Sequence, residues 1–177
     1  MKKILLINGS IRKESFNQEI LNYVSEKALE KGYTVDQVDY SEVPFFSQDI
    51  EFPTPNSVEK VRAKFENSDI VWIATPEYNG SVPGAFKNLL DWVSRPVVQG
   101  TFGAPEFVKG KTTVISGAAG RSQAALVLEE LNGLLTRMGL NVLEERVGLA
   151  LGEAFTTGKF ILSDEQKEQI NKVIEKL

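Results

Sequence analysis

Three segments of the chain place polar or small residues directly after an apolar run. The first, Gly9 to Asn17 (GSIRKESFN), follows KILLIN. A helix that begins at the end of such a segment has unpaired N–H groups and a partial positive charge at its start, so it attracts anions. The donors on Ser10, Arg12, Ser15 and Asn17 therefore predict a site for a single terminal phosphate. Composition alone also allows a simpler reading, in which Ser15 only caps the helix and Arg12 is a solvated charge.

The second segment, Pro76 to Pro83 (PEYNGSVP), follows the apolar run DIVWIAT. Gly80 permits a tight turn and a close approach of the backbone to a ligand. Tyr78 and Asn79 combine a flat apolar face with paired donor and acceptor groups, which suits a planar heteroaromatic ring with polar edges. The alternative is a plain turn, because the Asn-Gly dipeptide is common in turns.

The third segment, Ser116 to Ser122 (SGAAGRS), has only small residues before Arg121. Small residues let backbone N–H groups approach the edge of a ring and stabilise negative charge there. By itself this pattern equally describes an ordinary glycine-rich connection between a strand and a helix.

The composition narrows the possible chemistry. The chain has no histidine and no cysteine, which excludes Ser-His triads, thiol nucleophiles and histidine or thiolate metal sites. An enzyme of this composition relies on a bound cofactor, or on a carboxylate, lysine or tyrosine. The net charge of −4 argues against a nucleic-acid partner. No apolar run has the length of a membrane span, and MKKILLINGS reads better as a first strand than as a signal peptide, so we expect a cytoplasmic protein with no membrane partner.

Strand and helix patterns alternate along the chain. Apolar or β-rich runs predict strands at residues 3–8, 33–40, 69–75, 111–116 and 141–149. Helical spacing predicts helices at residues 17–31, 57–67, 83–94 and 122–138, and a last helix from residue 163. This alternation predicts one domain, residues 1–177, with an α/β fold: a three-layer, doubly wound sandwich whose five-stranded parallel sheet has the flavodoxin-like order 2-1-3-4-5. Ligands of such sheets bind beyond the carboxyl ends of the strands, where the three segments lie.

With these three segments the chain resembles the NAD(P)H-dependent FMN reductases of the flavodoxin-like superfamily, a family that includes quinone, chromate and azo-dye reductases. PEYNGSVPGAFKNLLDW is the most specific element of this resemblance, which runs from Met1 to about Gly139. Many members have a further glycine pair where this chain has Arg121-Ser122. The resemblance implies FMN as cofactor and NADPH or NADH as co-substrate.

The resemblance also implies three groups of cofactor-binding residues. Those for the phosphate are Ser10, Arg12, Ser15, Phe16 and Asn17. Those along the flavin ring are Pro76, Glu77, Tyr78, Asn79 and Gly80, and those at its other edge are Ser116, Gly117, Ala118 and Gly120. Because the flavin carries the redox chemistry, we predict no catalytic residue and no metal site.

The activity implied by the resemblance is hydride transfer from NAD(P)H through bound FMN to a small acceptor, such as a quinone, an azo compound, a metal oxyanion or free flavin. Arg12, Lys13 and Arg121 are candidates for the extra phosphate of NADPH, although a solvated charge is the favoured reading of Lys13. The long loops suggest an aromatic wall for the acceptor, from Phe45, Phe46, Phe102 and Phe107.

The resemblance implies a homodimer or homotetramer, with the helix from Pro83 at the subunit boundary. The alternative function is a flavodoxin-like FMN electron carrier without pyridine-nucleotide activity, which the weak net charge disfavours. A receiver-type signalling domain is excluded, because Asn8-Gly9 and Pro76-Glu77 occupy the positions where it needs acidic residues.

Overall fold

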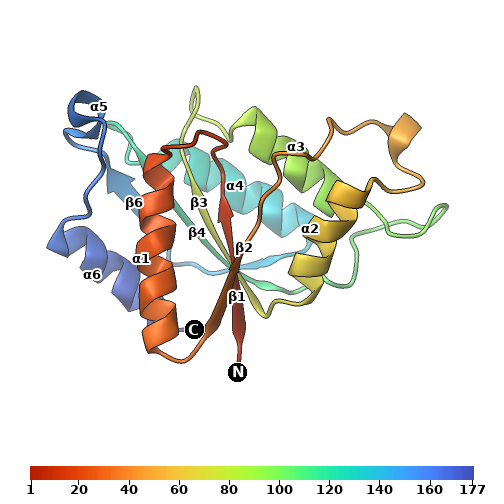
Figure 1. The fold of residues 1–177 in the computed structure, drawn as a ribbon, viewed down its shortest axis with the longest axis horizontal. Helices are drawn as coiled ribbons and strands as arrows, with labels where there is room; N and C mark the ends of the chain where they lie inside the picture. The colour runs from red at the N-terminus through yellow and green to blue at the C-terminus, as the bar shows by residue number, and fades with distance from the viewer.

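A parallel sheet forms the middle layer of the molecule (Figure 1). The structure is a computed structural model that describes residues 1–177. Its strands follow the predicted flavodoxin-like order β2-β1-β3-β4-β5, and a sixth strand, β6, pairs with β4. The strands are β1 (Lys3–Asn8), β2 (Thr34–Gln37), β3 (Ile70–Thr75), β4 (Thr112–Ala119), β5 (Asn141–Val142) and β6 (Val147–Ala150).

Helices cover both faces of the sheet, which confirms the three-layer α/β arrangement. One face carries α1 (Phe16–Glu30) and α6 (Asp164–Ile174). The other carries α2 (Asn56–Glu66), α3 (Gly84–Val93) and α4 (Ala125–Met138). Two short helices, η1 (Gln48–Ile50) and α5 (Ala154–Thr157), lie in connections. None of the helices combines the length and the apolar character that a membrane crossing requires.

The central strands have apolar side chains on both faces, which explains their continuous apolar runs. In β1, Leu5 and Ile7 pack toward α2, α3 and α4, whereas Ile4 and Leu6 pack toward α1 and α6. Every residue of β3 is buried. Both chain termini lie at the opposite end of the strands from the carboxyl ends of β1 and β3 (Figure 1). The carboxyl ends of these strands are therefore flanked by connecting loops.

The end of the chain departs from the predicted fifth strand. Residues 141–149 form two short strands, β5 and β6, which pair with different parts of β4. The charged residues between them pair outside the sheet, Glu145 with Lys176 and Arg146 with Glu129. Because β6 extends the ladder, β4 continues to Ala119 rather than ending near Ser116.

The long loop of residues 41–57 is packed across α3. The Pro44 carbonyl accepts hydrogen bonds from Asn88 Nδ2 (2.9 Å) and Trp92 Nε1 (2.7 Å). The ring of Phe46 stands perpendicular to that of Trp92, with centroids 5.0 Å apart. The loop therefore covers part of α3, the helix that we expected at a subunit boundary.

Candidate functional site

The carboxyl ends of β1, β3 and β4 border a cavity of about 520 Å³, here called the edge cavity. The three strands are in register at this edge, with Asn8 beside Ala74 and Ala74 beside Ser116. The cavity thus lies where the fold predicts a ligand. Its lining consists of Ser10, Arg12, Ser15, Phe16, Asn17, Pro76, Glu77, Tyr78, Ala118, Ala119, Gly120, Leu151, Phe155 and Gly158. Ten of these were predicted; Asn79, Gly80, Ser116 and Gly117 were predicted but are not part of the lining.

Asn8, which the sequence analysis did not select, organises the first loop. Its Oδ1 accepts hydrogen bonds from Ser10 N (2.9 Å) and Ser15 Oγ (3.3 Å), and its Nδ2 donates to Gln18 Oε1 (3.1 Å). Ser15 makes no side-chain capping hydrogen bond to α1. The first N–H groups of α1 are thus not capped by a side chain, and they lie beside the cavity as a ready-made anion site.

Arg12 supplies a positive charge at this end of the cavity. Its guanidinium lies over the ring of Phe16, with Cζ 4.4 Å from the ring centroid. It forms no ion pair with any carboxylate of the chain. The charge is therefore uncompensated and available to an anionic ligand.

Asn17 connects the first loop to the third. Its Oδ1 accepts a hydrogen bond from Ala118 N (2.8 Å) and its Nδ2 donates to Ala118 O (3.3 Å), a contact between residues 101 positions apart. The side chain is buried. Its amide is mainly a brace between α1 and β4, with one N–H left for a ligand, and phosphate contact by Asn17 stays a prediction.

The second loop makes a two-residue turn whose rim faces the cavity. Tyr78 and Ser81 exchange backbone hydrogen bonds of 3.0 Å in both directions. Between them Asn79 and Gly80 have φ of 54° and 75°, a left-handed pair that favours this dipeptide in tight hairpins. Asn79 and Gly80 thus shape the turn, while the half-exposed ring of Tyr78 lines the cavity.

The carboxylate of Glu77 accepts a hydrogen bond from the start of helix α4. Glu77 Oε2 accepts a hydrogen bond from Val127 N (3.0 Å) in the first turn of that helix. Ala124, at the N-cap position, has no side-chain acceptor to offer. Glu77 therefore caps α4 from another part of the chain, where its negative charge also suits the helix dipole.

The third loop begins later than predicted, because β4 continues to Ala119 and includes three predicted residues, Ser116, Gly117 and Ala118. Ser116 is fully buried in β4; its Oγ donates to Ile73 O (2.8 Å) and accepts from Trp72 Nε1 (3.0 Å). A Cβ on Gly117 would lie 2.5 Å from Thr75 O, so glycine allows these strands to approach closely. Ala118 and Ala119, the last two residues of β4, and Gly120 directly after them line the cavity.

A fourth wall comes from the connection between β6 and α6, which sequence reasoning missed. Leu151, Phe155 and Gly158 line the cavity from this side. The rings of Phe155 and Phe16 are nearly perpendicular, at 84°, with centroids 5.9 Å apart. The only sequence signal was an aromatic residue between two glycines, in LGEAFTTGK. The long-loop phenylalanines Phe45, Phe46, Phe102 and Phe107 do not line the edge cavity, and their place in an acceptor wall stays a prediction.

Tyr40 supports the first loop from behind. Its hydroxyl donates to Asn8 O at 2.7 Å. Burial raises the pKa of the Tyr40 phenol above its ordinary value, and the neighbouring Tyr78 contributes in the same direction. The phenol therefore stays neutral and keeps its hydrogen bond at physiological pH.

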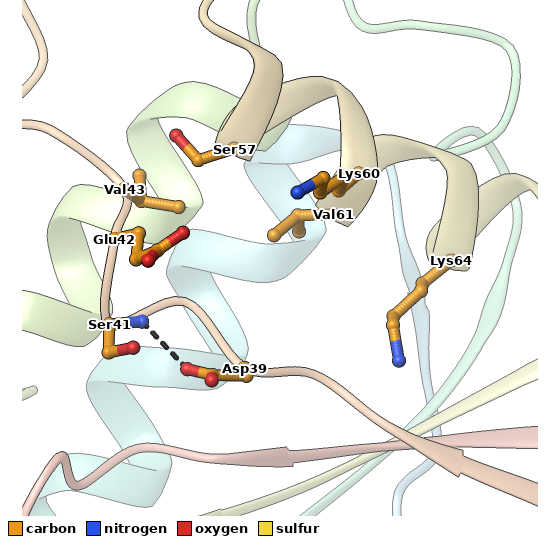
Figure 2. Close-up of a pocket in the computed structure, with 8 residues that line it drawn as sticks. All are labelled: Asp39, Ser41, Glu42, Val43, Ser57, Lys60, Val61 and Lys64. Atoms are coloured by element: carbon orange, nitrogen blue, oxygen red, sulfur yellow. Dashed lines mark hydrogen bonds between the residues drawn. The ribbon is translucent and has the colours of Figure 1, made fainter.

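A second cavity, of about 230 Å³, lies between the segment after β2 and helix α2 (Figure 2). We call it the α2 groove; its lining consists of Asp39, Ser41, Glu42, Val43, Ser57, Lys60, Val61 and Lys64. Ser41 N donates to Asp39 Oδ1 at 2.9 Å, and this hydrogen bond lowers the pKa of the Asp39 carboxyl. Lys64 Nζ forms an ion pair with Asp36 Oδ1 at a distance of 2.7 Å. The α2 groove thus contains charges of both signs and no aromatic wall.

Comparison with known proteins agrees with this geometry. The sequence pattern of the NADPH-dependent FMN reductase family matches residues 2–154. The chain is 31% identical over 176 residues to an NAD(P)H-dependent FMN reductase of Pseudomonas aeruginosa, covering 99% of this chain and 92% of that one. It is 31% identical over 144 residues to a 2-hydroxy-1,4-benzoquinone reductase of Burkholderia sp., covering 81% and 75% of the two chains.

Among solved structures, the fold is similar to that of FerB, a flavoenzyme NAD(P)H:(acceptor) oxidoreductase from Paracoccus denitrificans. The TM-score is 0.77 at 24% identity, with 99% of this chain and 96% of that one covered. The family match spans all three predicted loops, and the fold places them around one cavity. The chain therefore belongs to the NADPH-dependent FMN reductase family, whose enzymes use FMN with NAD(P)H as co-substrate.

Proposed function

We propose that this enzyme passes electrons from NADPH or NADH, through FMN held in the edge cavity, to a small planar acceptor of the quinone class. In the net reaction the quinone gains two electrons and two protons: NAD(P)H supplies a hydride, and solvent supplies the remaining proton. Relatives named quinone reductases support this acceptor class. Azo compounds, metal oxyanions and free flavin are the other acceptors implied by the family.

The observation that carries the proposal is that the edge cavity combines two kinds of lining. Donors and positive charge come from Ser10, Arg12 and the uncapped start of α1. Small and apolar surfaces come from residues that include Ala118, Leu151 and the ring of Tyr78. A phosphate fits the first kind of lining and a planar ring the second, so the residues present fit FMN.

When bound, FMN supplies the hydride-accepting chemistry that the side chains of this chain lack. The chain contributes binding and position. Arg12 and the N–H groups of α1 hold the anionic end, and the Asn17 brace fixes the first loop against the third. Glu77 holds the start of α4 rather than moving a proton. The chain offers no histidine, and we assign no acid or base.

The test is a visible spectrum of the purified protein after addition of FMN and removal of the excess. Absorbance near ~450 nm that bleaches with anaerobic NADPH or NADH, and returns when a quinone is added, is the expected result. Retained flavin that neither nucleotide reduces would instead favour the electron-carrier alternative. Light scattering on the same sample tests the accompanying proposal of a homodimer or homotetramer.

A further inference from the structure

The fourth wall of the edge cavity includes residues outside the part of the chain that matches the family. The family match ends at residue 154, whereas Phe155 and Gly158 line the cavity just beyond it. The family pattern therefore does not account for these two residues. Phe155 is also unusual for a cavity wall, because 69% of its surface is exposed.

Local contacts hold Phe155 at this position. It lies in α5, a single turn in which Gly158 N donates to Ala154 O (2.8 Å) and Thr157 Oγ1 donates to Glu153 O (3.1 Å). Its ring meets Phe16 edge to face, and Phe16 is in turn packed near the buried Phe160, with centroids 6.5 Å apart. The exposed ring is thus supported from below by an aromatic cluster rather than being a free surface side chain.

Exposure separates the walls of the cavity into two kinds. Ala118 and Leu151 are buried, at 1% and 6% exposure, as suits surfaces against a resident cofactor. Phe155 and Tyr78 are exposed, at 69% and 50%, and so lie at the mouth. A molecule that enters and leaves in each turnover meets the mouth, and two aromatic rings there offer offset or edge-to-face contact to another planar ring.

We propose that Phe155 is a specificity-determining residue for planar aromatic acceptors, which it contacts at the mouth of the edge cavity. This inference rests on the proposed function and adds to it the surface that selects the acceptor. Removing the ring should raise the KM for such an acceptor roughly threefold to tenfold. This increase corresponds to the binding free energy of one pair of aromatic rings.

The experiment compares Phe155→Ala and Phe155→Leu with wild-type holoenzyme. It uses 1,4-naphthoquinone as a planar acceptor and ferricyanide as one that cannot stack. Both variants should raise KM for the naphthoquinone and leave ferricyanide reduction unchanged, whereas Phe155→Tyr should behave as wild type. Phe102→Ala is the matched control, because Phe102 is 98% exposed and lies outside the cavity.

A second measurement distinguishes contact of Phe155 with the acceptor from contact with the cofactor. The Kd for FMN, followed by quenching of flavin fluorescence, should be the same in wild type and Phe155→Ala. Weaker FMN binding with equal slowing of both acceptors would overturn the proposal and place Phe155 against the cofactor. An unchanged KM for naphthoquinone in an active variant would overturn it as well. A wild-type protein whose flavin is not reduced by NADPH or NADH would instead refute the proposed function itself, and this inference with it.

Discussion

The edge cavity and the α2 groove are both concave and both polar, yet they differ in how their charges are satisfied. In the α2 groove, carboxylates and amines occur together, and Lys64 and Asp39 are already held by neighbouring groups. In the edge cavity, Arg12 has no carboxylate partner and the start of α1 has no side-chain cap. Of the two, only the edge cavity has aromatic side chains in its lining. A ligand site is thus marked by unpaired positive charge and free N–H groups beside aromatic surface, whereas a groove lined by two carboxylates and two amines is a solvated face.

The largest effect should come from the brace behind the edge cavity. Replacing Asn17 by alanine leaves the N–H and C=O of Ala118 without their partner in a buried position. We expect Asn17→Ala to lower the free energy of unfolding by about 2–3 kcal/mol, measured by urea denaturation. Asn22→Ala on the same helix is the control, since Asn22 only accepts an exposed hydrogen bond from Gln18. Equal decreases of the unfolding free energy in the two variants would mean that the hydrogen bonds between Asn17 and Ala118 stabilise the fold no more than one exposed hydrogen bond.

The next effect concerns charge. Arg12→Ala should weaken FMN binding roughly 10- to 100-fold, the worth of a hydrogen bond to a charged group. Fluorescence titration with FMN measures this directly. Lys60→Ala removes one positive charge from the α2 groove and should leave the Kd unchanged. If both variants weaken binding alike, overall charge rather than contact at the edge cavity holds the phosphate.

Tyr40→Phe tests the support beneath the first loop. Loss of the hydrogen bond to Asn8 O should cost about 1 kcal/mol of unfolding free energy. Because the pKa of Tyr40 is raised in the folded state, this contribution is complete below the ordinary tyrosine pKa of about 10 and is lost only as pH rises through the folded value. Denaturation at neutral pH and at about pH 9 should therefore give the same difference. Tyr33→Phe, whose hydroxyl makes no hydrogen bond within the protein, is the control.

The smallest effect should come from the α2 groove. The pKa of Asp39 is lowered by its hydrogen bond from Ser41 N, so the stabilisation is present above the ordinary aspartate pKa and is lost as pH falls through the folded value. Asp39→Asn should cost about 0.5 kcal/mol at pH 7, and the difference should shrink below about pH 4. Denaturation at the two pH values measures it. FMN affinity should not change; a change would show that the groove takes part in binding.

The regular part of the fold was predictable because its signal is local. A run such as IVWIAT must lie between two covering layers, and a Gly at position 139 ends its helix in the left-handed conformation. The end of β4 was not predictable, because SGAA is compatible with strand and loop alike. Ser116 and Gly117 pair with β3 on one side and, on the other, with β6, some thirty residues later along the chain; only the pairing with β6 extends the strand to Ala119.

The site shows the same limit. Residue types drew attention to Ser10, Arg12 and Tyr78, and the structure places all three in the lining of the cavity. The same reasoning did not reveal that Asn17 and Glu77 are used mainly by the protein itself, because their partners lie 101 and 50 positions away. Phe155 was missed because it approaches Phe16 only in the folded chain.

The splitting of the last strand also has a consequence for how copies of this protein meet in solution. An outer strand displays a row of free N–H and C=O groups on which another chain can add a strand. Here one border of the sheet is interrupted into pieces of two and four residues, and the other, β2, is also four residues long and carries Asp36. Neither border offers a long template, so strand addition between copies is disfavoured and a higher assembly must use side-chain surfaces instead.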